Sequence, residues 1–224
     1  MKPKPEPFCR CNPDQSEQIR LRRLRPEDSL EQLTGMLHRA FSRLGKMGLG
    51  CSCVNQTTDA TRERVARGEC FVATSGERIV GTITLYAPDT ASESRHYRNA
   101  RIASIRQLAV DPRFQGKGVG SALLRVAENW ARHRGYARLA LDTPEPAAHL
   151  VAYYRRQGFR IEQILQFPDR GYRSVIFAKT LLCSASLDPK PLTRPGSFCL
   201  LNVPQAAAND PQQHADSQAA NLRP

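Results

Sequence analysis

Residues 113–121 read RFQGKGVGS, between the apolar run IRQLAVDP and the helix-like run SALLRVAENWARHRG. The glycines at 116, 118 and 120 allow positive φ angles and leave room for a group to lie against the main chain. A helix that begins here exposes unpaired N–H groups and the positive end of its dipole. Lys117 adds a positive charge, and Arg113 can add another. The stretch therefore predicts a strand, an anion-binding turn and a helix, in that order.

The spacing of these glycines excludes the two most common nucleotide-binding loops. A Walker loop, G-x-x-x-x-G-K-[ST], fails because Gly116–Lys117 is followed by Gly118 and no glycine precedes it at the required distance. A dinucleotide fingerprint, G-x-G-x-x-G after the first strand, fails because the spacing is G-x-G-x-G and the turn lies in mid-chain.

The pattern that fits is Q-x-x-G-x-G, from Gln115 to Gly120, after a strand that ends in L-A-V-D-P. In this context it resembles [QR]-x-x-G-x-[GA], the signature of the GNAT superfamily of acyl-CoA-dependent N-acetyltransferases. Further along the chain, YYRRQGF at 153–159 resembles the L-Y-x-x-x-G-F segment of that family. An ordinary glycine-rich connection is the alternative, but two motifs in the right order favour a cofactor site. The resemblance covers roughly residues 18 to 180.

The resemblance implies an α/β fold, a mixed and mostly antiparallel sheet of roughly six or seven strands flanked by helices. The fourth and fifth strands of that sheet splay around acyl-CoA. Main-chain N–H groups of the glycine turn would hold the CoA pyrophosphate, and the end of the preceding strand would pair with the pantetheine arm. The residues assigned to the acetyl-CoA co-substrate in this way are Leu108, Ala109, Val110, Gln115, Gly116, Lys117, Gly118, Val119, Gly120 and Ser121.

The resemblance also assigns a catalytic residue. Tyr154, four residues before Gly158, stands where the family has a tyrosine that acts as general acid on the CoA thiolate. A phenol with a pKa near about 10 is protonated at neutral pH and can donate that proton. The alternative is a core tyrosine, since Tyr153 occupies the position usually held by leucine. Family transfer is direct, so attack by Cys70 is less favoured, and a main-chain N–H of Leu108 or Ala109 is the expected oxyanion donor.

The general base is not identified by the sequence. Many relatives carry a glutamate on the strand before the glycine turn, but residues 102–110, IASIRQLAV, contain no carboxylate. Glu69, His38, His96 or a water chain leading to one of them remain as candidates. His149 is a candidate CoA contact, whereas Ala147 replaces an asparagine that often contacts the cofactor.

Hydrophobic periodicity gives the remaining elements. It predicts strands at 18–24, 70–74, 78–86, 137–142, 159–167 and 173–181, and helices at 26–44, 57–68, 118–133 and 146–156. We expect residues 1–17 to form a flexible arm, 18–182 to form one domain, and 183–224 to be disordered.

Charge and cysteine content limit the partners and the location. The net charge is +12, and residues 1–17 and 183–224 are each neutral, so the whole excess lies in 18–182. This excess favours anionic partners, but no Lys/Arg block or aromatic interleaving is present, and a nucleic-acid surface is less favoured. The seven cysteines lack zinc spacing, so we expect reduced thiols and no metal. No apolar run suits a signal peptide or a membrane span, which predicts a cytoplasmic protein with no membrane partner.

The acceptor is expected to be an amine. The loops at 45–56 and 87–100, which would shape its site, contain no acidic cluster, and this disfavours polycations. Small amines, amino-acid derivatives and protein amines remain. A non-catalytic acyl-CoA-binding module is the main alternative function, and the sequence leaves open whether the chain forms a homodimer.

Overall fold

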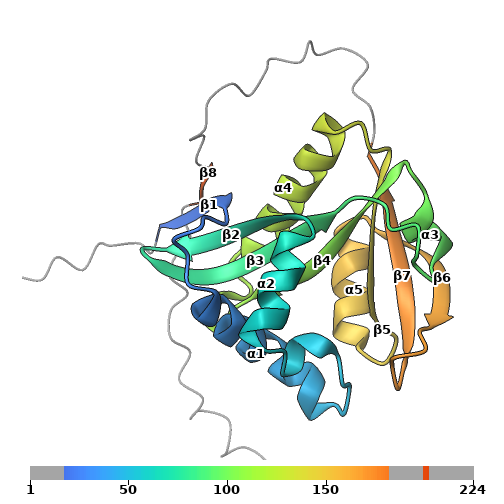
Figure 1. The fold of residues 1–224 in the computed structure, drawn as a ribbon, viewed down its shortest axis with the longest axis horizontal. Coiled ribbons are helices and arrows are strands. Elements are labelled where there is room, and N and C mark those ends of the chain that lie inside the picture. Colours follow the sequence, from blue (N-terminus) through green and yellow to red (C-terminus); the bar gives the residue numbers. More distant parts are fainter. Residues whose placement is uncertain (1–17, 182–198, 202–224) are drawn as a thin grey trace, which may run out of the picture.

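A single sheet organises the chain in the computed structural model, which describes residues 18–181 and 199–201 (Figure 1). The strand order is β6-β7-β5-β4-β3-β2-β1-β8. All neighbours pair antiparallel except β4 and β5, which run parallel. The strands are β1 (Ile19–Arg23), β2 (Glu69–Ser75), β3 (Arg78–Tyr86), β4 (Ile102–Val110), β5 (Arg138–Pro144), β6 (Arg160–Gln166), β7 (Arg173–Thr180) and β8 (Cys199–Leu201).

Helices cover both faces of this sheet (Figure 1). α1 packs through Leu33, Met36 and Leu37 on the face that carries Val72 and Ala109. α4 packs on the opposite face, where the largest core cluster lies. The helices are α1 (Leu30–Lys46), α2 (Thr58–Ala66), α3 (Arg95–Arg98), α4 (Val119–His133) and α5 (Ala148–Arg156), with the 3-10 turns η1 (Ser52–Val54) and η2 (Pro112–Phe114). None of the helices among the described residues is long and apolar enough to cross a bilayer.

The predicted fold class is confirmed, including the mixed sheet of seven strands within 18–181. One strand was not predicted: Cys199–Leu201 pair with β1 as β8, inside the tail for which we expected disorder. The rest of that tail, and the N-terminal arm at 1–17, lie outside the described residues.

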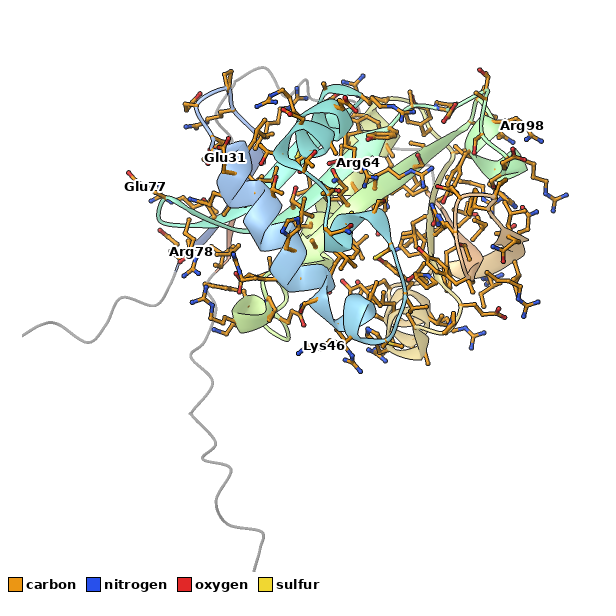
Figure 2. All side chains as sticks on the ribbon, turned by 60° about the horizontal axis from the view of Figure 1, so that its bottom comes forward. Glu31, Lys46, Arg64, Glu77, Arg78 and Arg98 are labelled. Carbon is orange, nitrogen blue, oxygen red and sulfur yellow. The ribbon has the colours of Figure 1, made fainter. Side chains whose placement is uncertain are left out.

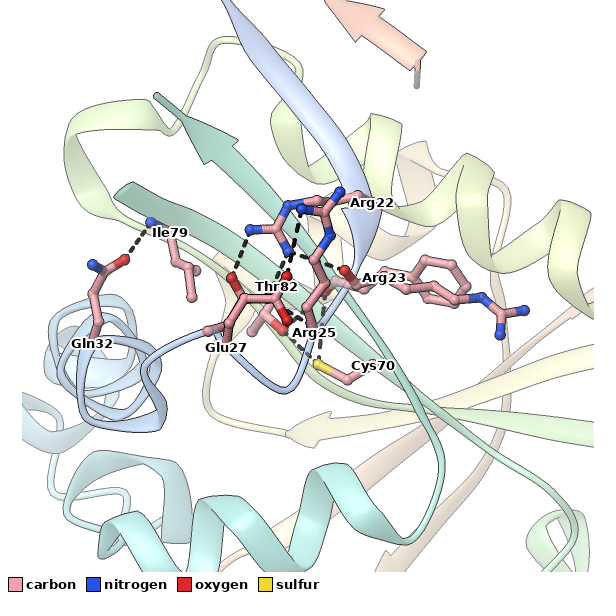
Figure 3. Close-up of polar contacts among 10 residues, drawn as sticks. Arg22, Arg23, Arg25, Glu27, Gln32, Cys70, Ile79 and Thr82 are labelled. Atoms are coloured by element: carbon pink, nitrogen blue, oxygen red, sulfur yellow. Dashed lines mark hydrogen bonds and ion pairs between the residues drawn. The ribbon is translucent and has the colours of Figure 1, made fainter. Parts of the chain in front are cut away.

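The first helix begins later than the pattern from residue 26 predicts. Asp28 does not enter the helix, because its carboxylate accepts hydrogen bonds from the Arg22 guanidinium at 2.6 and 2.7 Å and from the Arg25 N–H at 2.7 Å. Ser29 then caps α1 by accepting the Gln32 N–H at 3.1 Å. Gln32 in turn accepts the Ile79 N–H at 2.6 Å, which ties α1 to β3 (Figure 3).

Strand β4 contains a bulge that changes which face its side chains occupy. The register against β3 shifts between Thr82 and Thr84, and Gln107 adopts φ 49°, the only non-glycine positive φ among the described residues. Before the bulge Ile105 faces the α4 cluster; after it Leu108 packs there and Ala109 faces α1.

The parallel pairing of β4 with β5 is short. It joins Ile102–Ser104 to Arg138–Ala140 and no further, although β4 continues to Val110 and β5 to Pro144. The two strands therefore separate after their first three pairs, as predicted for the fourth and fifth strands.

Candidate active site

The glycine turn has the geometry that its sequence predicts. Gly116 and Gly118 have φ angles of 74° and 81°, and Gly118 is the residue before α4. The first backbone hydrogen bond into this helix joins the Ala122 N–H to the Gly118 carbonyl at 3.0 Å. Among the described residues, no acceptor meets the N–H groups of residues 116–121. Six donors at a helix N-terminus form an anion-binding surface.

Side chains attach this turn to the end of β4. The Gln115 amide donates to the Val110 carbonyl at 2.9 Å. Phe114 is buried, and the Lys117 ammonium lies 5.2 Å from the centre of its ring. Gln115 thus ties the glycine turn to the end of β4. The hydrogen-bond donors that remain for a ligand are the main-chain N–H groups of the turn.

The end of β4 has an open edge. Val110 and Ala109 pair with Gly81 and Thr82 of β3 on one side, but within the described part of the chain no strand pairs with the edge toward β5 after Ser104. Leu108 and Val110 place their side chains against the core. An extended ligand with amide groups can add to such an edge as a strand does.

A groove of about 430 Å³ lies where α1 meets the segment between β4 and the glycine turn. Its lining includes two arginines, and both bind the fully buried Asp111: Arg39 through Nε at 3.0 Å and Arg113 through Nε at 3.3 Å. The groove is lined by His38, Arg39, Ser42, Asp111, Pro112 and Arg113.

Tyr154 lies on α5, in an aromatic environment. Its ring centre is 5.3 Å from that of Tyr153, 6.1 Å from Phe159 and 5.7 Å from Phe177. The side chain is buried, and none of the described residues hydrogen-bonds its hydroxyl. Burial raises the pKa of Tyr154 well above its ordinary value. The phenol therefore stays protonated and can serve as a proton donor, not as a base.

Tyr153 contacts the glycine turn, a contact that we did not predict. A Cβ atom on Gly120 would lie 2.7 Å from the Tyr153 hydroxyl oxygen. That hydroxyl is buried and has no hydrogen-bond partner among the described residues. The signal was visible in the sequence, since tyrosine replaces the leucine usual at position 153.

A polar cluster surrounds the bulge on β4. The Gln107 amide donates to Gln56 Oε1 at 3.3 Å and accepts from Thr84 Oγ1 at 3.5 Å. Gln56 Oε1 also accepts from Arg64 at 3.0 Å, and the Gln56 amide donates to Thr61 at 2.6 Å. The loop at 45–56 therefore reaches the strand that precedes the glycine turn, as its predicted role requires.

The three candidate bases occupy different places. Glu69 binds Arg23 at 2.8 Å and also Arg134, so its carboxylate is committed to two cations. His96 lies on α3 near Glu162, and burial lowers its pKa. Only His38 joins the cluster around Gln107, through a 2.8 Å hydrogen bond between its Nε2 and the Gln56 carbonyl.

Burial also changes the pKa of His149, the candidate CoA contact, and of Cys70, the alternative nucleophile. Burial, aided by the charge of Arg43, lowers the pKa of His149 at the start of α5. Burial raises the pKa of the Cys70 thiol, which lies 3.4 Å from Thr82 Oγ1 (Figure 3). A protonated core thiol is a poor nucleophile. Among the described residues, no group of three His, Cys, Asp or Glu side chains could hold a metal ion.

A buried ion cluster joins β4 to β5 beyond their last paired residues. Asp142 Oδ1 accepts from Arg106 and from the Tyr97 hydroxyl, both at 2.7 Å, and Oδ2 accepts from Arg170. Burial favours the neutral acid, but the two cations and the hydrogen bonds outweigh it and lower the pKa of Asp142. The cluster was not predicted, although an aspartate at the end of the apolar run ARLALD was visible.

Comparison with known proteins agrees with this geometry. A family model described as the acetyltransferase (GNAT) family matches residues 42–159, just over half of the chain. The human N-acetyltransferase 8B is 31% identical over 105 residues, which cover 46% of this chain and 44% of that protein. The S-(2-succino)cysteine N-acetyltransferase of Bacillus subtilis is 27% identical over 139 residues, which cover 61% of this chain and 82% of that protein.

Solved structures share the fold. A GNAT family acetyltransferase from Elizabethkingia anophelis with acetyl-CoA bound aligns with a TM-score of 0.55 at 18% identity. The alignment covers 73% of this chain and 98% of that one. The chain thus spans less than half the length of its human relative but the whole fold of this neighbour. With the family model, the two motifs and the separated parallel strands in agreement, the chain belongs to the GNAT family of acetyltransferases.

Proposed function

We propose that this protein is an N-acetyltransferase that transfers an acetyl group directly from acetyl-CoA to a primary amine of a small molecule or a protein. The observation that carries the proposal is the set of six unbonded N–H groups at residues 116–121, directly after the open edge of β4. The pyrophosphate suits those donors, and the pantetheine amides suit the edge at Leu108–Val110.

The chemistry needs three contributions from the protein. The neutral amine attacks the thioester carbonyl carbon, and a main-chain N–H of Leu108 or Ala109 stabilises the oxyanion. When the intermediate collapses, the C–S bond breaks and the thiolate takes a proton from the Tyr154 hydroxyl. Because burial raises the pKa of Tyr154, the phenol carries this proton at any physiological pH, and it holds the proton more tightly than an exposed phenol does. The acetylated nitrogen loses its extra proton to water, and the Tyr154 phenolate takes a proton back from water, which restores the phenol.

The substitution Tyr154→Phe tests the acid assignment. We expect kcat to fall by on the order of 10²-fold, with an unchanged Kd for acetyl-CoA, because only the proton donor is removed. Free thiol release gives kcat, and calorimetry gives the Kd. The control is Tyr136→Phe, since Tyr136 stacks on Trp130 at the end of α4. Wild-type turnover by Tyr154→Phe would exclude Tyr154 as the acid.

A non-catalytic acyl-CoA-binding module is a second candidate, and one observation favours it. β4 carries no carboxylate, and the bulge position holds Gln107 instead. Incubation with acetyl-CoA and a panel of amines separates the two, with product mass and free thiol as readouts. The enzyme predicts an acetylated amine, whereas the module predicts acetyl-CoA binding without any product.

The names of the relatives indicate the general size of the acceptor. The Bacillus subtilis relative is named for S-(2-succino)cysteine, a small amino-acid derivative, and it covers more of this chain than the human relative does. We therefore propose small amines of this size as the first acceptors to test.

A further inference from the structure

Three arginines from separate parts of the chain lie around the bulge of β4, since Arg106 and Arg170 share Asp142 and Arg64 reaches Gln107 through Gln56. They are Arg64 on α2, Arg106 on β4 and Arg170 in the segment between β6 and β7. In Figure 2, Arg64 lies near the centre of the view, whereas Arg98 and Lys46 lie at its periphery. A partly buried guanidinium is stabilised by a nearby anion, either a side chain of the protein or a group that binds there.

Arg64 has no carboxylate partner among the described residues. Its guanidinium donates to Gln56 Oε1 at 3.0 Å, to Ser52 Oγ at 2.7 Å and to Cys53 Sγ at 3.4 Å. All three acceptors are neutral, and they hold the planar group in one orientation. A guanidinium fixed by neutral groups keeps its full charge for a further ligand.

Arg106 and Arg170 share a single carboxylate. Both bind Asp142, whose side chain is 9% exposed, while the two arginine side chains are about one quarter exposed. With Arg64 included, three guanidinium groups face one carboxylate. Asp169 also acts on Arg170, but without a salt bridge, so this region keeps a positive surplus.

These charges act on common neighbours. Burial raises the pKa of the Cys53 thiol, and the cations of Arg64 and Arg170 both oppose that rise. Burial likewise raises the pKa of Tyr86, opposed by Arg67, Arg106 and Arg64. Tyr86 also donates its hydroxyl proton to the Arg64 carbonyl at 2.7 Å.

The positive surplus lies at and before the bulge of β4, whereas the glycine turn follows the bulge. Gln56 joins Arg64 to Gln107, and Gln107 precedes the stretch at 108–110 that leads into the glycine turn. The phosphates of acetyl-CoA would occupy the turn itself, beyond the end of β4. The positive surplus at Arg64, Arg106 and Arg170 therefore favours a second anionic group at this place.

We propose that Arg64, with Arg106 and Arg170, binds a carboxylate of the acceptor, which is then an amino acid or an amino-acid derivative with a free carboxylate. This rests on the proposed acetyltransferase function. In an α-amino acid the carboxylate is two bonds from the amine nitrogen, so both groups fit beside one bulge. Guanidinium groups match carboxylates through paired, parallel hydrogen bonds.

Matched acceptors test the proposal on the full-length protein. The probes are L-phenylalanine with 2-phenylethylamine, and L-leucine with 3-methylbutylamine, where each amine is the amino acid without its carboxylate. We expect the amino acids to have kcat/KM values at least about tenfold higher. Arg64→Gln should reduce that ratio to about twofold or less, because kcat/KM falls for the amino acids more than for the plain amines, and circular dichroism shows that the variant folds.

Arg62→Gln is the control, because Arg62 lies on the same helix, is exposed and pairs with Asp59. It should preserve the tenfold ratio. The proposal is overturned if wild-type protein uses the plain amines equally well, or if Arg64→Gln keeps the preference. Failure of the underlying function looks different, since acetyl-CoA would then bind but neither member of any pair would be acetylated.

Discussion

Gly120 has room for a hydrogen atom and for nothing larger. The Tyr153 hydroxyl oxygen would lie 2.7 Å from a Cβ atom at position 120, but the ring carbon that carries it would lie at 3.6 Å, an ordinary contact. The glycine is therefore required by one oxygen atom of a neighbouring side chain. The family signature permits alanine at this position, so the requirement comes from this chain's own tyrosine.

We expect Gly120→Ala to destabilise the fold by about 1–3 kcal/mol through overpacking and to weaken acetyl-CoA binding. Adding Tyr153→Phe should restore most of both losses, since the clashing oxygen is gone. Urea denaturation and calorimetry measure the two effects. Gly50→Ala is the control, because a Cβ there meets nothing within 4 Å. Strictly additive effects in the double variant would contradict the contact.

For single residues, the sequence predicted the features that depend on neighbours a few positions away in the chain. The closely spaced glycines predicted a turn with positive φ angles, and Gly116 and Gly118 have them, while the acid role of Tyr154 on α5 stays a prediction. Gln107 and Arg64 were missed because their meeting depends on the bulge and on the path of residues 52–56. The positions of Gln107 and Arg64 depend on contacts between residues far apart in the sequence, and hydrophobic periodicity does not predict such contacts.

Among the elements, β4 and β5 depend on the carboxylate of Asp142. Its removal leaves two guanidinium groups without their anion, and breaking a buried pair in this way costs about 3–5 kcal/mol. We expect Asp142→Ala to lose that much in urea denaturation at pH 7. Glu145→Ala, which removes an exposed partner of Arg173, should cost less than about 1 kcal/mol. Similar losses for both variants would contradict a structural role for the cluster.

The same carboxylate gives stability a pH dependence of known sign. The pKa of Asp142 is lower in the folded protein than its ordinary value, so the folded state binds this proton more weakly than the unfolded chain does. Its contribution is present above the unfolded pKa of about 3.9 and is lost as pH falls through the folded value. The difference in unfolding free energy between the wild-type protein and Asp142→Asn should therefore shrink as the pH falls from 7 toward 3, which urea denaturation at each pH can measure.

The boundaries of elements were predicted less well than their order. All seven strands of 18–181 lie where alternation and apolar runs place them, because burial on a sheet face imposes that pattern. The start of α1 was wrong by four residues, since Asp28 binds Arg22 and Arg25 rather than the helix. Short polar residues can serve either purpose, and only the tertiary neighbour decides.

On the scale of the whole molecule, β8 covers an edge of the sheet. Cys199–Leu201 pair with Ile19–Leu21, and without them β1 would present unpaired main-chain groups to other molecules. A chain that ends at residue 181 should therefore self-associate in a concentration-dependent way, as analytical ultracentrifugation can show. A chain that ends at 203 keeps β8 and is the control. Identical sedimentation of the two chains would show that β8 does not prevent self-association.

The tie from Arg106 to Asp142 also bears on how much the protein must change when a ligand arrives. The separation of β4 from β5 is held by bonds within the free protein, across strands that no longer pair. Preorganisation of this kind means that no part of the binding free energy is consumed in parting the strands. A ligand that enters between these strands therefore meets strands that are already parted, and its binding has no strand separation to drive.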